Sequence, residues 1–219
     1  MNFIFLGKQG VGKGTYAQRF SVQQGIPTIS TGELLREEVK TGSELGKKLN
    51  EIMNSGALAP EEIVTEILEK RLSKPDCRNG FILDGFPRND AQADQLGPML
   101  KRLGKKLDFV IDFYASEKTL MERLTGRWQC KQCGKIYHTK NLPPKVSGKC
   151  DVDESDLYQR EDDKPKAIKK RFAIYEGQTK PILERYRKQC ILVEMNADRV
   201  VDEVLEDLKK LVKQKAKKK

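Results

Sequence analysis

The chemically most informative residues of this sequence form a glycine-rich loop close to its start. Gly7, Gly10, Gly12 and Lys13 follow the spacing G-x-x-x-x-G-K within residues 7–15. Glycines let the backbone curl so that successive N–H groups point inward, and a lysine and a helix N-terminus add positive charge. Because a short apolar run precedes the loop and a helical pattern follows it, the segment predicts a P-loop that holds nucleotide phosphates.

One position in this loop departs from the usual pattern. Gly14 stands where a P-loop normally has the Ser or Thr whose hydroxyl binds magnesium, so we expect Thr15 to be the displaced candidate. An isolated glycine-rich turn is more often an ordinary loop. The preceding strand, the following helix and a lysine in register together favour the phosphate site.

A second apolar run ends in a carboxylate. Residues 81–84 finish at Asp84, and a Gly-Phe-Pro turn leads from there to Arg88. An Asp at the carboxyl end of a parallel strand lies beside the P-loop, where it can orient magnesium through water. Arg88 offers five donors in a planar fork that suits a phosphate. The run therefore predicts a second part of the same phosphate site.

Three of the five cysteines gather in one later segment. Two residues lie between Cys130 and Cys133. After sixteen further residues, Cys150 and Asp153 have the same spacing. Two such pairs offer four ligands to one tetrahedral ion, which predicts a structural zinc site without an open catalytic position. His138 is the rival fourth ligand. The alternative interpretation is three reduced thiols without a metal.

These side chains need elements that position them, and the sequence predicts a parallel sheet flanked by helices. Short β-rich runs alternate with longer helical patterns. The strand candidates are residues 3–6, 27–29, 81–84, 109–114 and 191–194, and the helix candidates are residues 14–24, 32–40, 43–54, 60–73, 90–103, 117–125, 165 to about 177, and one from about 200. Residues 30–59 and 127–164 interrupt this alternation and are expected to be insertions on a nucleotide-binding core.

Composition excludes several classes of protein. A chain of 219 residues with 37% hydrophobic content can bury a core, whereas its longest apolar runs are far shorter than the ~20 residues of a membrane span. Five cysteines, an odd number, fit poorly with a disulfide framework. We see no basic leader with a cleavage site at the start and therefore expect a cytoplasmic location.

The net charge is +10, and seven lysines between residues 209 and 219 supply much of the excess positive charge. A solvated helix end explains these lysines better than a nucleic-acid-binding arm.

Four blocks of this sequence resemble the adenylate kinase family, and the resemblance covers essentially the whole chain. The blocks are residues 7–15, 30–36, 84–92 and 157–163. The resemblance implies an α/β P-loop kinase core with a five-stranded parallel sheet (residues 1–29, 60–126 and 165–219), a helical AMP-binding insertion (residues 30–59) and a zinc-bearing lid over ATP (residues 127–164). It further implies a monomeric enzyme that uses Mg²⁺ to transfer the terminal phosphoryl group of ATP to AMP, giving ADP.

The resemblance also assigns roles to single residues. It gives ATP contacts to Gly10, Val11, Gly12, Lys13, Gly14, Thr15, Arg123, Arg127, Tyr137 and Arg199, with Arg123 stacking on adenine; AMP contacts to Thr31, Arg36, Ala57, Ala59, Gly85, Arg88, Gln92, Arg160 and Arg171; catalytic roles to Lys13, Asp84, Arg88, Arg123, Arg160 and Arg171; and zinc to Cys130, Cys133, Cys150 and Asp153. The chain departs from the family at three places. Lys8 and Gln9 replace a small residue and Pro, Glu33 replaces a frequent Asp, and residues 196–199 only loosely match the segment whose backbone contacts adenine.

Two other functions compete with this interpretation. The nearer one is a nucleoside monophosphate kinase that uses UMP, CMP or GMP, or GTP as the donor. Thr31 and Gln92 at the positions that contact the AMP base favour adenine, as the family pattern implies. The other is a nucleic-acid binder built on a zinc ribbon and a basic tail, which leaves the P-loop and residues 84–88 unexplained. We therefore expect ATP, AMP and ADP as partners, and neither nucleic acid nor a membrane.

Overall fold

A sheet of five parallel strands forms the centre of the molecule in the computed structural model, which describes residues 1–216 of the chain. The strands lie in the order β2-β3-β1-β4-β8, and every neighbouring pair is parallel. Their bounds are β1 Asn2–Leu6, β2 Thr28–Ser30, β3 Phe81–Asp84, β4 Phe109–Tyr114 and β8 Leu192–Asn196. The predicted fold class is confirmed, because all five predicted strands are present within two residues of their expected ends.

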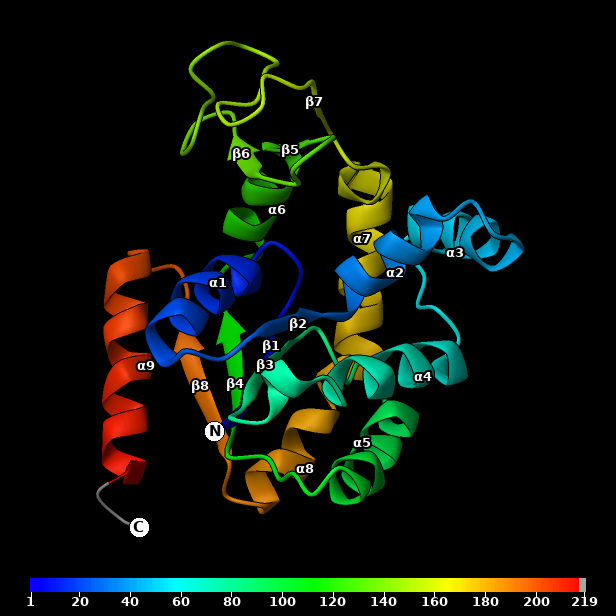
Figure 1. The fold of residues 1–219 in the computed structure, drawn as a ribbon. Coiled ribbons are helices and arrows are strands. Elements are labelled where there is room, and N and C mark those ends of the chain that lie inside the picture. The colour runs from blue at the N-terminus through cyan, green and yellow to red at the C-terminus, as the bar shows by residue number, and fades with distance from the viewer. Residues whose placement is uncertain (217–219) are drawn as a thin grey trace.

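Nine helices among the described residues surround and extend this sheet (Figure 1). They are α1 Lys13–Gln24, α2 Thr31–Lys40, α3 Glu44–Asn54, α4 Glu61–Leu72, α5 Asp90–Arg102, α6 Glu117–Thr125, α7 Pro165–Ile174, α8 Ile182–Lys188 and α9 Val201–Ala216. Three of them begin at a side-chain cap: Ser43, Asn89 and Ser116 accept a hydrogen bond from the backbone N–H three residues later. Short 3₁₀ turns cover Pro75–Cys77 and Glu161–Asp163.

Two helical features differ from the prediction. The helix expected from residue 165 to about 177 ends at Ile174 and continues as a π-turn, Tyr175–Thr179. Helix α8 was not predicted, because its seven residues are too few to produce a clear helical periodicity. Lys217–Lys219, part of the expected C-terminal lysine tail, lie outside the described residues.

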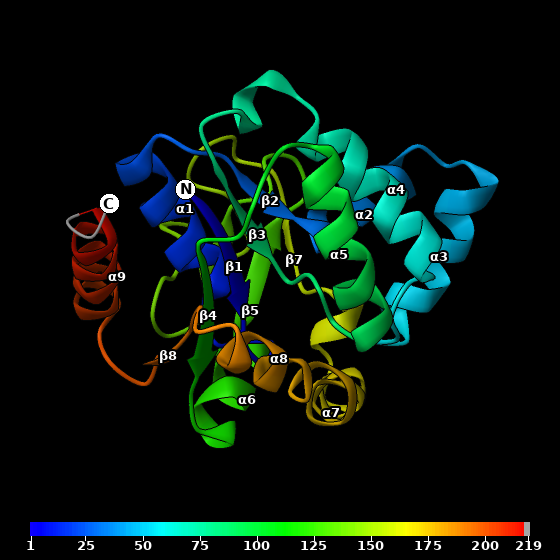
Figure 2. The same ribbon diagram turned by 90° about the horizontal axis from the view of Figure 1, so that it is seen from below.

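Side chains that alternate along the strands give the sheet two apolar faces. Ile4 and Leu6 pack in one core with α4, α5 and α8, whereas Phe3 and Phe5 pack in the other with α1, α6, α7 and α9. The view from below shows α1 and α9 on one side of the sheet and α4 and α5 on the other (Figure 2). A sheet covered on both faces explains why its strands read as continuous apolar runs.

Residues 127–164 contain a second, smaller sheet. Strands β5 Arg127–Cys130, β6 Ile136–His138 and β7 Leu157–Tyr158 pair antiparallel in the order β6-β5-β7. The sequence did not predict these strands, since each is only two to four residues long. Figure 1 shows this sheet beyond the end of α6, and α2 and α3 projecting to the other side of α7. The expected pair of helices in residues 30–59 is confirmed.

The strand order fixes where a site can form. Strand β1 pairs with β3 on one side and β4 on the other, so that the chain reverses its winding direction at β1. Ligands of such sheets bind outside the carboxyl ends of the strands at this point. The loops that follow β1 and β3 leave from that edge. In residues 1–216 no helix has the length and apolar character needed to cross a membrane.

Candidate active site and metal centre

The loop after β1 has a backbone that only glycine can adopt at two positions. Gly7 has φ +133°, and a Cβ there would lie 2.2 Å from the carbonyl oxygen of Phe113. Gly10 has φ +84°, and a Cβ there would lie 2.9 Å from the carbonyl oxygen of Leu120. Both positions combine a left-handed conformation with a close approach of another backbone. The loop therefore curls tightly against β4 and α6, as the glycine pattern predicted.

Lys13 begins α1 and folds back over this loop. Its ammonium donates hydrogen bonds to the carbonyl oxygens of Gly7 at 2.6 Å and Lys8 at 3.0 Å. Burial lowers the pKa of Lys13 to about 8, although the nearby Asp84 opposes the shift. A cation held in a buried loop beside a helix N-terminus is suited to a phosphate, because the phosphate would compensate its desolvation.

Asp84 ends β3 and faces the first turn of α1. A Cβ built on Gly14 would lie 3.8 Å from its Oδ2. Burial raises the pKa of Asp84, while Lys13 and Arg88 oppose the shift. The structure thus brings together the P-loop lysine and the carboxylate that ends the second apolar run. Thr15 lies one residue further along α1 and is exposed.

The turn after β3 gathers the predicted AMP residues at one place. Thr31 donates its hydroxyl to the carbonyl oxygen of Gly85 at 3.1 Å, and Arg88 Nε donates to the same oxygen at 2.7 Å. The Gln92 side-chain oxygen accepts the backbone N–H of Arg88 at 2.8 Å. This bond fixes the orientation of the amide, so that Gln92 Nε2 is available as a donor. Thr31 and Gln92 are both buried, which favours a specific polar contact over a solvated one.

Three further predicted AMP residues lie on the α2–α4 segment. The guanidinium of Arg36 lies over Gly32, and burial lowers its pKa despite the nearby carboxylates of Asp162 and Glu33. Ala59 is buried in the core and Ala57 is half-buried, so they can contribute main-chain contacts and packing. Their side chains offer no polar group.

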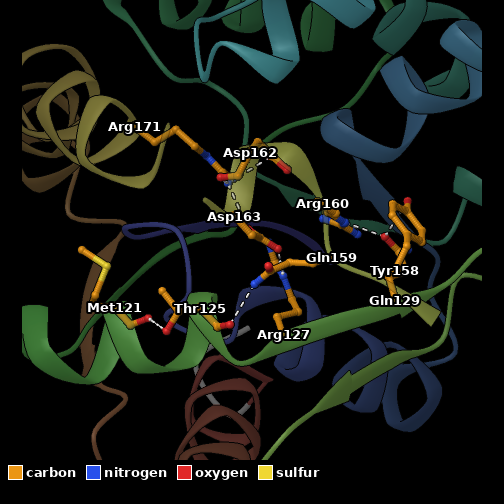
Figure 3. Close-up of polar contacts among 10 residues, drawn as sticks. All are labelled: Met121, Thr125, Arg127, Gln129, Tyr158, Gln159, Arg160, Asp162, Asp163 and Arg171. Carbon is orange, nitrogen blue, oxygen red and sulfur yellow. Dashed lines mark hydrogen bonds and ion pairs between the residues drawn. The ribbon is translucent and has the colours of Figure 1, made fainter. Parts of the chain in front are cut away.

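Two arginines of the predicted site pair with aspartates after β7, and a third, Arg160, bonds Gln129 (Figure 3). Arg127 forms a bidentate pair with the fully buried Asp163, with Nε–Oδ2 at 2.7 Å and Nη2–Oδ1 at 2.5 Å. Arg171 Nη1 lies 3.0 Å from the Asp162 carboxylate and donates to the Asp162 carbonyl at 2.9 Å. Arg160 Nε donates to the side-chain oxygen of Gln129 at 2.5 Å. Each guanidinium is therefore oriented by a fixed acceptor.

The arginines of the site lie close enough to repel one another, and this repulsion contributes to lowered pKa values. Burial, followed by the charges of Arg36 and Arg127, lowers the pKa of Arg160 to about 10. Burial also lowers the pKa of Arg88, where Arg171 adds to the effect. Converging cations in a poorly solvated space attract a polyanion strongly. The arrangement is suited to a chain of phosphates.

Arg123 on α6 links two loops at this edge of the sheet. Its Nη1 donates to the carbonyl oxygen of Val11 at 3.2 Å and its Nη2 to that of Ala197 at 3.0 Å. A surface cavity of about 330 Å³, within the usual size range of ligand sites, opens beside Arg123 and is also lined by Gly126, His138 and Lys140. Room for a base therefore exists beside Arg123, which itself contacts the P-loop at Val11.

Two of the predicted ATP residues have side chains that form other contacts in the structure. Arg199 pairs with Glu203 at 3.1 Å and Asp207 at 2.8 Å, so its guanidinium lies along α9. Tyr137 is 1% exposed, and its hydroxyl donates to Cys150 Sγ at 3.4 Å. Its side chain therefore belongs to the interior of the small sheet. The expected contacts of these two residues with ATP stay predictions.

The four predicted metal ligands do come together. The ligand atoms of Cys130, Cys133, Cys150 and Asp153 all lie within 4.8 Å of one another. Cys130 Sγ is 3.3 Å from Asp153 Oδ1, and Cys133 Sγ is 3.5 Å from Cys150 Sγ. Tetrahedral bonds of about 2.3 Å imply ligand separations of roughly 3.5–3.8 Å, so the cluster can hold a zinc-sized ion. Both x2 pairs contribute, as the spacing predicted.

His138, the alternative fourth ligand, forms hydrogen bonds outside the cluster. Its Nδ1 accepts the backbone N–H groups of Lys140 and Asn141 at 3.1 and 3.2 Å, and its Nε2 lies 3.2 Å from the carbonyl oxygen of Glu122 on α6. Both ring nitrogens are therefore used where β6 meets α6. Asp153, not His138, completes the cluster.

Asp162, Asp163 and Gln129 were not predicted to contribute to the site. They hold the site arginines in place, and the signal in the sequence was the acidic run at residues 161–163 between Arg160 and Arg171. Pairing between residues 36 positions apart, as in Arg127 and Asp163, cannot be deduced from spacing.

Comparisons with known proteins agree with this geometry. The family model described as "Adenylate kinase" matches residues 5–191. Curated relatives named "Adenylate kinase" include a protein of Thermosipho melanesiensis, 46% identical over 97% of this chain and 100% of the relative. One of Archaeoglobus fulgidus is 46% identical over 97% of this chain and 98% of the relative, and one of Oceanobacillus iheyensis is 45% identical over 98% and 100%.

Proposed function

Because this chain belongs to the adenylate kinase family, we propose that it transfers the terminal phosphoryl group of ATP to AMP at the site described above. The observation that carries this proposal is the convergence of Lys13, Asp84 and Arg88 at the carboxyl edge of the sheet, facing arginines from α7 and the segment before it. Phosphoryl transfer consists mainly of positioning and charge stabilisation, and these side chains provide both.

We assign the ATP phosphates to the P-loop. Backbone N–H groups of residues 10–15 and the Lys13 ammonium would bind the β- and γ-phosphates. The base would lie beside Arg123, for which the adjoining cavity provides room. Arg123 already joins the P-loop to the turn at Ala197, so a base beside it would contact both loops.

We assign AMP to the turn after β3 and to α2. Arg88 and Arg36 would bind its phosphate, and Thr31, Gly85 and Gln92 would contact its base. The fixed amide of Gln92 supports adenine, because its Nε2 can donate to the N1 edge while the oxygen keeps a second lone pair for the 6-amino group. Ala57 and Ala59 would pack against the nucleotide through their main chain.

The reaction then needs no general base. An oxygen of the AMP phosphate attacks the γ-phosphorus of ATP in line, the bond to the β-phosphate oxygen breaks, and two molecules of ADP result. Arg127, Arg160 and Arg171 would neutralise charge on the transferred group from the lid side. Water competes as a nucleophile, so the two insertions must exclude it when they close over the nucleotides.

The residues present fit a magnesium ion bound with ATP. Thr15 lies in the first turn of α1 and Asp84 faces this turn, so both would orient water molecules in the ion's coordination shell. Magnesium would supply neutralisation of charge on the β- and γ-phosphate oxygens.

We also propose that zinc fills the cysteine cluster. Cys130, Cys133, Cys150 and Asp153 would supply a closed set of four ligands, which leaves no position for a reactive water. The role of this ion would be structural. Its coordination would join the two turns of a small sheet whose own buried cluster is limited to Cys130, Tyr137, Cys150 and part of Leu157.

These assignments divide the chain into three parts. We propose residues 1–29, 60–126 and 165–219 as the catalytic core, 30–59 as the AMP-binding insertion and 127–164 as the lid. The separate antiparallel sheet in the third part and the projecting helices α2 and α3 in the second support this division.

A coupled assay tests the proposal directly. ADP formation from ATP is measured with AMP, UMP, CMP and GMP in turn, and again with GTP as the donor. We expect AMP with ATP to give the highest kcat/KM. A higher value for another pair would assign the chain to a different nucleoside monophosphate kinase.

A further inference from the structure

The π-turn after α7 contacts three segments that carry the proposed site. Tyr175 donates its hydroxyl to the Asp112 carboxylate on β4 at 2.9 Å. Thr179 donates its hydroxyl to the carbonyl oxygen of Arg88 at 2.7 Å. Glu176 Oε1 lies 2.8 Å from the ammonium of Lys8 in the P-loop. Single π-turns within helices occur frequently at functional sites, and this one adjoins the helix that carries Arg171.

Lys8 contacts the P-loop on one side and α7 with its π-turn on the other. Its carbonyl oxygen accepts the Lys13 ammonium at 3.0 Å and the Val11 N–H at 3.3 Å. Its side chain is 19% exposed, and the ammonium lies 5.3 Å from the ring centroid of Phe172 on α7. One residue thus supports the catalytic lysine with its main chain and reaches α7 and the π-turn with its side chain.

We propose that Lys8 is a positioning residue for phosphoryl transfer, which fixes the P-loop relative to α7 through Glu176. The inference rests on the proposed function of the P-loop. Lys13 on one side and Arg171 on the other must reach the same phosphoryl group, and small misplacements of catalytic groups are costly to the rate. The pair Lys8–Glu176 and the contact with Phe172 set the separation of these two cations.

The alternative role for Lys8 is a direct contact with phosphate. Substitution of Glu176 distinguishes this role from the positioning role. If Lys8 acts by holding α7, removal of the Glu176 charge has the same effect as removal of the lysine charge. If Lys8 binds phosphate itself, removal of Glu176 frees the ammonium and strengthens ATP binding. A partly exposed ion pair contributes little to stability, so neither variant should unfold the protein.

The experiment compares Lys8→Met, Glu176→Gln and the double variant by steady-state kinetics and thermal melting. We expect each single variant to lower kcat by about 3- to 30-fold, and the double variant to equal the singles, because the two residues act as one unit. The KM for ATP should change by less than about twofold, since the geometry of the transition state is affected more than ground-state binding. Lys8→Arg should recover most of the rate.

Lys180→Met is the matched control. Lys180 pairs with the other oxygen of Glu176 at 2.8 Å, but its side chain is 59% exposed and does not reach the P-loop. This variant should keep the parent kcat. A raised KM for ATP in Lys8→Met at unchanged kcat, or full activity in Glu176→Gln, would overturn the proposal. Lys13→Met tests the P-loop assignment separately, so failure of that assignment is distinguishable from failure of this one.

Discussion

The P-loop core and the lid both hold charged groups in fixed positions, but different interactions stabilise them. In the core, Lys13 and Asp84 lie at the edge of a sheet whose two faces are packed in large apolar clusters. In the lid, the buried cluster consists of Cys130, Tyr137 and Cys150, and two of these residues are themselves proposed metal ligands. Burial therefore supports the site in the core, whereas coordination has to support the lid. The chemistry and the metal should accordingly be separable.

The largest effect is expected in the core, for Lys13→Met. The substitution keeps the stem and removes the charge, so that the γ-phosphate loses a preorganised cation. We expect kcat to fall by at least about 10²–10³-fold. Thermal melting should show little loss of stability, because a buried charge is replaced by an apolar group of similar length. ADP formation and a melting curve measure the two effects, and a rate within about threefold of the parent would contradict the P-loop assignment.

The next effect is expected in the lid, for substitution of Asp153. Asp153→Ala removes one ligand and should reduce zinc content and the melting temperature, by roughly 5–15 °C if a few kilocalories per mole of binding free energy are lost. Asp153→Cys should retain or tighten the metal. His138→Ala is the matched control, because both ring nitrogens of His138 contact the chain outside the cluster. Stoichiometric zinc in Asp153→Ala together with its loss in His138→Ala would reverse the assignment of the fourth ligand.

The third effect, on acceptor specificity, is expected for a residue of the core, Gln92. Gln92→Leu removes the fixed amide and leaves the Arg88 N–H without its acceptor. We expect kcat/KM for AMP to fall by about 10- to 100-fold and that for CMP to change much less. Asn89→Ala is the control, since Asn89 caps α5 through the Gln92 N–H and should cost about 1 kcal/mol of stability without changing the AMP:CMP ratio. An unchanged ratio in Gln92→Leu would remove Gln92 from base recognition.

The smallest effect concerns stability near the site. Burial raises the pKa of Asp112 from 3.8 to about 6, although the hydrogen bond from Tyr175 opposes the shift. The folded protein thus retains this proton up to a higher pH than the unfolded chain, and its stability falls as the pH rises from about 4 to about 6. Asp112→Asn avoids the ionisation, so we expect a gain of about 2–3 kcal/mol at pH 8 and little at pH 4. Denaturant unfolding at both pH values measures it; an equal gain at the two values would contradict the assigned pKa.

The core was more predictable from sequence than the lid, for physical reasons. Continuous apolar runs such as Phe81–Asp84 mark buried parallel strands, and the helical spacing of Val204, Leu205 and Leu208 marks the buried face of α9. The lid strands are too short for a period to develop. Cysteine spacing still identified the cluster, because ligand geometry is local.

Long-range polar contacts were the part that sequence could not reveal. The pairing of Arg127 with Asp163 and the place of Tyr137 against Cys150 depend on how the chain folds back on itself. Helix α8 and the π-turn before it lack a pattern of their own. Their positions follow from packing against the sheet and from the contacts of Tyr175 and Thr179.

Removal of the metal from the intact protein tests the separation of chemistry and metal most directly. The protein is stripped with a chelator, the chelator is removed, and kcat for ATP and AMP is measured with magnesium well below the melting temperature of the stripped form. A zinc-reloaded sample provides the reference. We predict that kcat of the stripped enzyme stays within about threefold of the reloaded enzyme while its melting temperature is clearly lower, since the reacting groups lie outside the cluster. Loss of activity in stripped protein that is still folded, with recovery on reloading, would contradict the account and assign the lid metal a part in the reaction.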